Sequence, residues 1–354
     1  MAAALTRLPL IGKVYGVCCA LLIAMLIAAR FTPLYALSFI SVSRESALYY
    51  RDMQRMQTVS VPLPAHVTQL AVSPDGTWIA YTDIRAGRYT LILNNLIHET
   101  QQVFPIEDGS ITYLTWSPDS RSLAYQRDVL GTTGLFIYDV TRNQARQITD
   151  LWRCRSLAWS PDGGSLACNG FSARQFDVTD QMLIFDTRTD SGPRALSVTP
   201  SAVSAVTWSP DGTQLLFAQA RFRRSPQLIR YDLPGDTWLP LSDEDIVLDS
   251  PSPSFSPDGR WIVYTSREAG SSIPIMRLMT RSGEIVRDLD FLPVTQSYMR
   301  VEWSPDSRLI AARAWLMQGD IITGLVIVNT ETGRVQEVIY DSFAHSLGWL
   351  TAED

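Results

Sequence analysis

Six aspartates share one short context, Ser-Pro-Asp, and form the most regular set of potential acid, base or metal-ligating groups in this chain of 354 residues. They are Asp75, Asp119, Asp162, Asp211, Asp258 and Asp306, at intervals of 43 to 49 residues. Proline presets the backbone of a turn, aspartate hydrogen-bonds to its own backbone, and the glycine that follows in four copies tolerates a positive φ. We therefore interpret the six aspartates as structural turn residues.

The other residue types with catalytic potential show no recognisable arrangement. The three histidines, His66, His98 and His345, have no spacing that indicates a shared metal ion. The chain lacks a Gly-x-Ser-x-Gly nucleophile elbow and a phosphate-binding loop, and its single lysine, Lys13, flanks an apolar segment. We predict no catalytic residues, no metal, no cofactor and no enzymatic activity.

Arginines and aromatic residues are the best candidates for a binding surface. Arg221-Phe222-Arg223-Arg224 places an aromatic side chain among guanidinium groups, a combination common in interface hot spots. The corresponding loop one repeat earlier carries Phe171, Arg174 and Phe176. We expect both loops to bind a protein or peptide partner; the alternative is a solvated surface of mixed charge.

Cys154 and Cys168 could form a disulfide bond. Cys154 lies six residues before its repeat serine and Cys168 lies eight residues after it, so a hairpin centred on the turn places them nearly opposite each other. The alternative is a pair of buried thiols. Cys18 and Cys19 lie in an apolar segment and are expected to stay reduced.

The elements that position these residues repeat with the turn. Each Ser-Pro-Asp follows an alternating run, such as Leu114 and Trp116, and precedes a returning apolar strand, a third strand and a shorter fourth strand. Four antiparallel strands in each of six units predict an all-β fold, a six-bladed β-propeller, with a solenoid as the alternative. Val59-Ser60-Val61 is expected to complete the last blade and close the ring, although Leu347-Gly348-Trp349 repeats the first-strand pattern without its turn.

The pattern Leu-x-Trp-Ser-Pro-Asp-Gly-x-x-Ile/Leu-Ala-Tyr resembles the WD-like repeat of TolB-type propellers and of the propeller domain in prolyl oligopeptidases and dipeptidyl peptidases. The resemblance covers about Thr58 to Leu350, and Ser120 and Ser307 depart from it where they replace the turn glycine. It implies a propeller but not one activity, because propellers host many functions. The few residues after Leu350 are too short for a hydrolase domain, which adds to the expectation of a non-catalytic protein.

The amino-terminal segment predicts a membrane anchor. Val14 to Ala29 is an uncharged apolar run of 16 residues, and residues 8–29 together are long enough to span a bilayer as a helix. A cleaved signal peptide is the alternative. We expect an anchor over residues 1–42, a partly helical stem over 43–56 and the propeller over 57–354. Basic residues are nearly balanced across the span, so the expectation of an extracytoplasmic propeller rests on the TolB-type resemblance.

Composition limits the possible partners. The formal net charge of -6 argues against nucleic acid, which binds basic surfaces. The sequence therefore predicts a membrane-anchored, non-catalytic propeller that serves as a protein-protein interaction platform or an accessory subunit of a membrane complex. The alternative is a channel-mouth hydrolase or lyase, or a glycan-binding module of the cell envelope.

Overall fold

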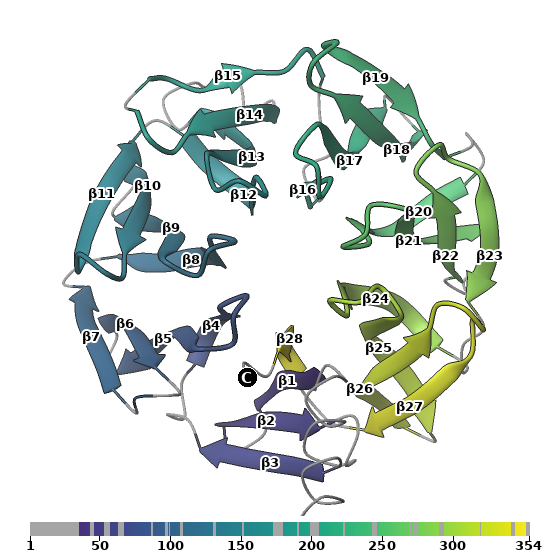
Figure 1. The fold of residues 1–354 in the computed structure, drawn as a ribbon, viewed down its shortest axis with the longest axis horizontal. Helices are drawn as coiled ribbons and strands as arrows, with labels where there is room; N and C mark the ends of the chain where they lie inside the picture. The colour runs from purple at the N-terminus through teal and green to yellow at the C-terminus, as the bar shows by residue number, and fades with distance from the viewer. Residues whose placement is uncertain are drawn as a thin grey trace, which may run out of the picture.

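Seven four-stranded antiparallel sheets are arranged around a central axis as the blades of a β-propeller in the computed structural model (Figure 1). The structure describes residues 35–351 with gaps at 43–45, 53–56, 63–66, 86–87, 96–97, 99, 107–108, 130–131, 151, 173–179, 190, 199–204, 222–223, 243–245, 269–270, 272–274, 290–293, 319 and 341–343. Within these residues there is no helix, and the predicted anchor helix at residues 8–29 lies outside them.

Six blades each consist of four consecutive strands, numbered from the channel outwards. Blade 1 comprises β4 (Val67–Val72), β5 (Trp78–Arg85), β6 (Arg88–Asn95) and β7 (Thr100–Ile106). Blade 2 comprises β8 (Ser110–Trp116), β9 (Ser122–Val129), β10 (Thr132–Asp139) and β11 (Gln144–Thr149). Blade 3 comprises β12 (Trp152–Trp159), β13 (Ser165–Ser172), β14 (Gln181–Asp186) and β15 (Arg194–Ala195). Blade 4 comprises β16 (Thr207–Trp208), β17 (Gln214–Arg221), β18 (Arg224–Asp232) and β19 (Thr237–Pro240). Blade 5 comprises β20 (Ile246–Phe255), β21 (Trp261–Glu268), β22 (Ile275–Thr280) and β23 (Ile285–Leu289). Blade 6 comprises β24 (Val294–Trp303), β25 (Leu309–Gln318), β26 (Asp320–Asn329) and β27 (Val335–Tyr340).

The seventh blade joins the two ends of the described chain, and it corrects the prediction of six blades. Its strand order is β28 (Ala344–Thr351), β1 (Tyr35–Val42), β2 (Ser46–Asp52) and β3 (Gln57–Pro62). The innermost strand therefore comes from the carboxyl-terminal part of the chain, and Ser38 pairs with Gly348. Because no turn connects β28 to β1, this blade needs no Ser-Pro-Asp sequence, and counting that motif misses it.

Two predicted boundaries change as a result. β1 and β2 lie in segments expected to belong to the anchor and to a partly helical stem, but both are strands of the seventh sheet. The segment Val59-Ser60-Val61 does form an outer strand that joins the chain ends, as β3, but it belongs to the seventh blade. Closure removes the exposed strand edges that an open ring would leave.

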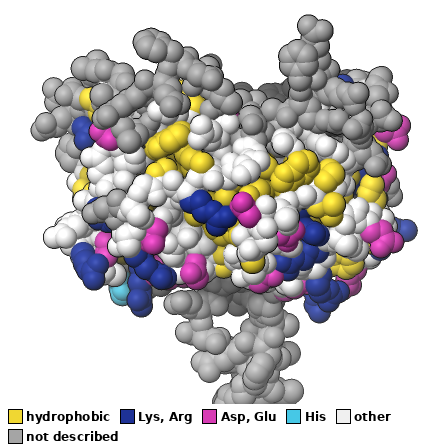
Figure 2. Space-filling model, turned by 90° about the horizontal axis from the view of Figure 1, so that it is seen from above, with side chains coloured by type: hydrophobic (Ala, Val, Ile, Leu, Met, Phe, Trp, Pro, Cys, Tyr) yellow, Lys and Arg dark blue, Asp and Glu magenta, His cyan; other side chains and the backbone are white. Residues whose placement is uncertain are grey.

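The hydrophobic core lies between neighbouring blades. The second strands are buried on both faces, as shown by Ile79, Ala80 and Tyr81, with no more than 1% exposure. One cluster packs Ala80 and Leu93 of blade 1 against Trp116 and Leu123 of blade 2, and similar clusters follow around the ring. Outer strands are more exposed, and all four residues of β19 are exposed. The side of the molecule seen in Figure 2 carries both charged and apolar side chains. Blades 1 to 6 are thus stabilised mainly by burial against their neighbours.

Polar contacts repeat at these same junctions. The indole Nε1 of Trp116 donates to the carbonyl of Ala71 in the preceding blade at 3.1 Å. Trp159 and Trp208 donate in the same way to Thr115 and Ala158, at 3.1 and 3.0 Å. In blade 5 the equivalent residue is Phe255, whose side chain has no hydrogen-bond donor. In blade 6 it is Trp303, whose buried Nε1 has no hydrogen-bond partner in the described part of the chain. The repeat aromatic therefore links blades by a hydrogen bond in some positions and by packing alone in others.

Candidate functional site

The Ser-Pro-Asp aspartates lie in one recurring turn. In all six copies the serine hydroxyl donates to the aspartate Oδ1 at 2.5 to 2.6 Å. The same carboxylate oxygen accepts the backbone N–H two residues later, for example that of Thr77 at 2.9 Å. The serine hydroxyl also accepts the N–H that begins the next strand, such as that of Trp78 at 2.8 Å. These contacts use the carboxylates to stabilise the turns, and we call the edge of the ring that carries these turns the turn rim.

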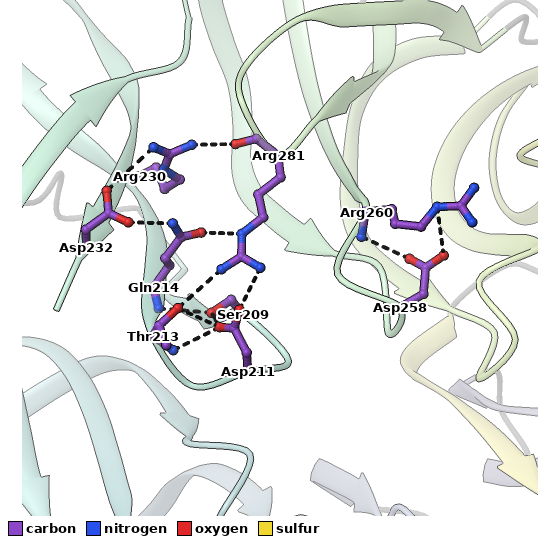
Figure 3. Close-up of polar contacts among 9 residues, drawn as sticks. All are labelled: Ser209, Asp211, Thr213, Gln214, Arg230, Asp232, Asp258, Arg260 and Arg281. Carbon is purple, nitrogen blue, oxygen red and sulfur yellow. Dashed lines mark hydrogen bonds and ion pairs between the residues drawn. The ribbon is translucent and has the colours of Figure 1, made fainter. Parts of the chain in front are cut away.

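Arg281 is the centre of a network of polar contacts on the turn rim (Figure 3). It extends from blade 5 to blade 4, where its guanidinium contacts Asp211 at 2.6 Å, Gln214 at 2.6 Å and Thr213 at 3.2 Å. Arg230 of blade 4 donates to the carbonyl of Arg281 at 2.7 Å. The side-chain hydrogen bond from Arg281 is the main reason that the pKa of Asp211 lies below its usual value. This network joins two blades and leaves its central guanidinium occupied.

A second group of charged side chains lies towards the opposite rim, between blades 2 and 3. Their innermost strands, β8 and β12, are neighbours in the ring (Figure 1), and both contain a β-bulge. In β8 the pairing skips from Thr112 to Thr115, and Tyr113 between them has a φ of 57°. In β12 the pairing skips Arg155. Bulges redirect side chains, and a non-glycine residue at positive φ marks local strain that is common at functional sites.

Arg155 is held from two sides. Its Nε lies 2.9 Å from Oδ1 of Asp180, a carboxylate whose side chain is only 8% exposed. Its guanidinium carbon lies 4.9 Å from the centre of the Phe171 ring. The Arg155 side chain itself is 39% exposed, and neither terminal nitrogen has a hydrogen-bond partner among the residues that the structure describes. The guanidinium is therefore fixed in place while its two Nη groups remain available.

Arg153, two residues earlier, is held in a similar way by blade 2. Its terminal nitrogen Nη2 lies 3.2 Å from Asp128, and its Nε donates to Thr133 at 3.3 Å. Thr133 in turn donates to Asp128 at 2.7 Å. Burial and these charges together determine the pKa of the Tyr113 phenol. Burial is the largest effect and raises the pKa, Arg155 and Arg153 lower it, and Asp128 raises it. The phenol is therefore a neutral hydrogen-bonding group at physiological pH.

Buried groups support the two bulges. Gln126, 1% exposed, accepts the N–H of Cys154 at 2.7 Å and donates to Thr112 at 3.2 Å, so one side chain connects both bulged strands. Gly170 is opposite Cys154, and a Cβ at that position would lie 2.3 Å from the carbonyl oxygen of Arg153. These contacts fix the backbone that carries Arg153 and Arg155. We call Tyr113, Asp128, Arg153, Arg155, Phe171 and Asp180 the channel-mouth cluster.

Cys154 and Cys168 form a disulfide bond beneath this cluster, with a Cα–Cα distance of 5.5 Å. The two residues are nearly opposite each other, as predicted, but they are not directly paired, because Cys154 is opposite Gly170 and Cys168 is opposite Leu157. The bulge at Arg155 brings the two cysteines together as diagonal neighbours. Both are buried, with exposures of 1% and 0%.

The structure brings together only part of the predicted binding surface. Phe171 belongs to the channel-mouth cluster, through Arg155. Arg174, Phe176, Phe222 and Arg223 lie outside the described residues. Arg221 and Arg224 end β17 and begin β18 and pair with each other, and only their backbone is described. The predicted contact between these two loops stays a prediction.

Sequence reasoning missed most of the channel-mouth cluster. The available signal was Arg153-Cys154-Arg155, two charged residues within an innermost strand that is otherwise read as an alternating apolar run. The aspartates that fix these arginines come from β9 and from the residue before β14. Among the described residues, no group of three or more His, Cys, Asp or Glu side chains is suited to hold a metal ion.

The family model for the TolB beta propeller domain matches residues 51–307. The chain belongs to this family. The resemblance inferred from the repeat motif is therefore confirmed.

Curated relatives contradict the expectation that the protein is not an enzyme. The chain is 26% identical over 213 residues to "Uncharacterized peptidase YuxL" of Bacillus subtilis, covering 56% of this chain and 29% of that protein. It is 25% identical over 277 residues to "Dipeptidyl-peptidase 5" of Porphyromonas gingivalis, covering 75% of this chain and 39% of that protein. The chain thus spans well under half the length of these relatives. Both relatives are named as peptidases, whereas the sequence motifs predicted no enzyme.

Solved structures show the same fold. TolB from Acinetobacter baumannii superposes with a TM-score of 0.56 at 18% identity, covering 89% of this chain and 82% of that one. A structure from an analysis of two prolyl endopeptidases gives a TM-score of 0.65 at 15% identity, covering 87% of this chain and 50% of that one. No helix among the described residues is long and apolar enough to cross a membrane.

Proposed function

We propose that this propeller recognises a polypeptide at the channel-mouth cluster and that this recognition serves peptidase activity. The observation that carries the proposal is Arg155, fixed by buried Asp180 and stacked on Phe171 with its terminal nitrogens available. A prepositioned guanidinium beside aromatic side chains is the combination that dominates polypeptide interfaces, because little entropy is lost when it binds. The two curated relatives named as peptidases support polypeptides as the ligand class.

The cluster can bind without rearranging. Its two arginines are already paired with carboxylates, so each guanidinium keeps an oppositely charged partner when a ligand excludes water from it. Tyr113 and Phe171 supply aromatic surface beside these charges, and Tyr113 is 38% exposed. A polypeptide can use both kinds of group, through its backbone carbonyls and its side chains.

Binding and hydrolysis by the purified full-length chain test the proposal. Short fluorescein-labelled peptides of varied sequence should bind, and Arg155→Gln should weaken binding by about tenfold, the loss expected for one hydrogen-bonded charge. Arg188→Gln is the matched control, because this arginine lies on the turn rim and is 70% exposed. Mass spectrometry of the same peptides reports cleavage. If no peptide binds and none is cleaved, the proposal is wrong.

The membrane anchor, the extracytoplasmic location and the protein partner remain part of the proposal. The apolar segment at residues 8–29 supports them, and so does the family resemblance. Carbonate washing and detergent extraction of cell membranes, with protease accessibility of the propeller in intact and opened cells, test both anchoring and side. Release by carbonate would refute the anchor, and propeller cleavage only in opened cells would refute the extracytoplasmic location.

A further inference from the structure

The channel-mouth cluster contains two ion pairs in which the arginine is the more exposed partner. Arg153 and Arg155 flank Cys154 on the innermost strand of blade 3, and each is fixed by one aspartate, Asp128 or Asp180. The two positive and two negative groups balance. The aspartates, however, are the less exposed partners, with side-chain exposures of 22% and 8% against 45% and 39% for the arginines. The accessible part of each ion pair is therefore the guanidinium.

The remaining donors favour an anionic oxygen. Arg155 uses only Nε towards Asp180, so its Nη1 and Nη2 groups are free to donate within the described part of the chain. Arg153 uses Nε and Nη2, and its Nη1 has no hydrogen-bond partner among the described residues, so it can donate as well. The planar fork of arginine matches the two oxygens of a carboxylate. Tyr113 adds a neutral phenol that can donate one further hydrogen bond.

Charge decides between carboxylate and phosphate. The two arginines and two aspartates give the cluster no net charge, so attraction rises at most linearly with ligand charge, whereas the cost of removing an anion from water rises with the square of its charge. A singly charged carboxylate is therefore favoured over a dianionic phosphate. The Phe171 ring, 4.9 Å from the Arg155 guanidinium carbon, also favours an organic ligand that can place apolar atoms beside it.

We propose that Arg155, Arg153 and Tyr113 bind a carboxylate group of the polypeptide ligand, either an acidic side chain or the carboxyl terminus. This inference rests on the proposed polypeptide recognition and names the chemical group that is recognised. Arg155 supplies the paired donors, Arg153 the second positive charge, and Tyr113 a neutral donor. Asp180 and Asp128 act as positioning residues that hold the two guanidiniums.

Paired ligands test the inference with the full-length chain. Calorimetric titration compares peptides that differ only in Glu against Gln, and in a free against an amidated carboxyl terminus. The preferred carboxylate peptide should bind at least about tenfold more tightly than its uncharged partner, and this difference should decrease as salt is added. The pair that shows this difference identifies the source of the carboxylate. Equal affinities in both pairs would overturn the inference while leaving polypeptide recognition intact.

A small ligand separates this inference from the proposed function. Butyrate should bind and butyramide should not, and both Arg155→Gln and Arg153→Gln should abolish butyrate binding while Arg188→Gln retains it. If butyrate binds but no peptide does, the carboxylate site is supported and polypeptide recognition is wrong. If neither butyrate nor any charged peptide binds preferentially to the folded wild-type protein, the carboxylate site is refuted, whatever the variants do.

Discussion

The side-chain oxygen of Gln126 in blade 2 accepts a hydrogen bond of 2.7 Å from the backbone N–H of Cys154 in blade 3. The Gln126 side chain therefore pairs a buried backbone donor that lies next to the bulge at Arg155. Gln126→Ala should therefore lower the free energy of unfolding by about 1–3 kcal/mol, because a buried donor loses its partner. Urea unfolding measures the effect. Gln144→Ala, at an exposed position of β11, is the control and should change little. Equal effects of the two substitutions would contradict this account.

The Cys154–Cys168 disulfide should be present in protein isolated under oxidising conditions. Both cysteines are buried in the junction between blades 2 and 3. Closing a loop with a sequence separation of 14 should contribute about 3 kcal/mol, so Cys154→Ser with Cys168→Ser should lower the urea midpoint markedly. Mass spectrometry after alkylation in denaturant, with and without reductant, detects the bond. Alkylation of both thiols without reductant would show that the bond is absent.

Trp208 and Trp303 should respond differently to the same substitution. Trp208→Phe removes a 3.0 Å hydrogen bond to the carbonyl of Ala158, whereas Trp303→Phe removes a buried N–H that has no partner in the described part of the chain. Trp208→Phe should cost about 1 kcal/mol more in unfolding free energy than Trp303→Phe. Calorimetric melting of the two variants provides the comparison. A larger loss at Trp303 would show that its indole nitrogen makes a contact that this structure lacks.

The contact between Arg281 and Asp211 should make stability depend on acidity. Hydrogen bonds, that from Arg281 being the largest contribution, hold the pKa of Asp211 below its usual value in the folded protein. The unfolded chain therefore binds more protons below about pH 4, and this stabilisation is present above that pH and is lost as pH falls towards the folded pKa.

Arg281→Met removes this effect. At neutral pH it should cost about 1 kcal/mol, a modest value because Asp211 is 46% exposed, and the cost should shrink below about pH 4. Arg260→Met is the control, since this arginine is 71% exposed and lies 3.6 Å from Asp258 within its own turn. Urea unfolding from neutral to acidic pH gives both curves. A difference between wild type and Arg281→Met that stays constant as pH falls would contradict the assignment.

Substitutions of Tyr113 should affect stability and binding separately. Its φ of 57° lies in the left-handed region, which asparagine tolerates and a β-branched residue resists. Tyr113→Asn should therefore be more stable than Tyr113→Val by about 1–2 kcal/mol. Both variants lose the phenol and should weaken binding of the preferred carboxylate peptide. Thermal melts and peptide titrations test the two halves separately, and a Val variant as stable as the Asn variant would argue against strain at this position.

The sequence by itself determined the turns and strands of the repeated four-stranded unit. Ser117, Pro118 and Asp119 encode a turn through local hydrogen bonds, and the alternating residues before it encode a strand with one buried face, so neither requires knowledge of distant parts of the chain. The same local signals gave the family resemblance, and they placed Cys154 near Cys168 because both belong to one hairpin.

Only the tertiary structure decided the number of blades and the composition of the channel-mouth cluster. The seventh blade pairs β28 with β1 from the other end of the chain, so no turn motif marks it. Arg153 is fixed by Asp128 of the neighbouring blade, and Arg155 is re-aimed by a bulge that shifts the register by one residue. These features arise from contacts between segments distant in sequence and from a local departure from strand periodicity. Neither a sequence motif nor a residue period along the chain can predict such contacts or the bulge.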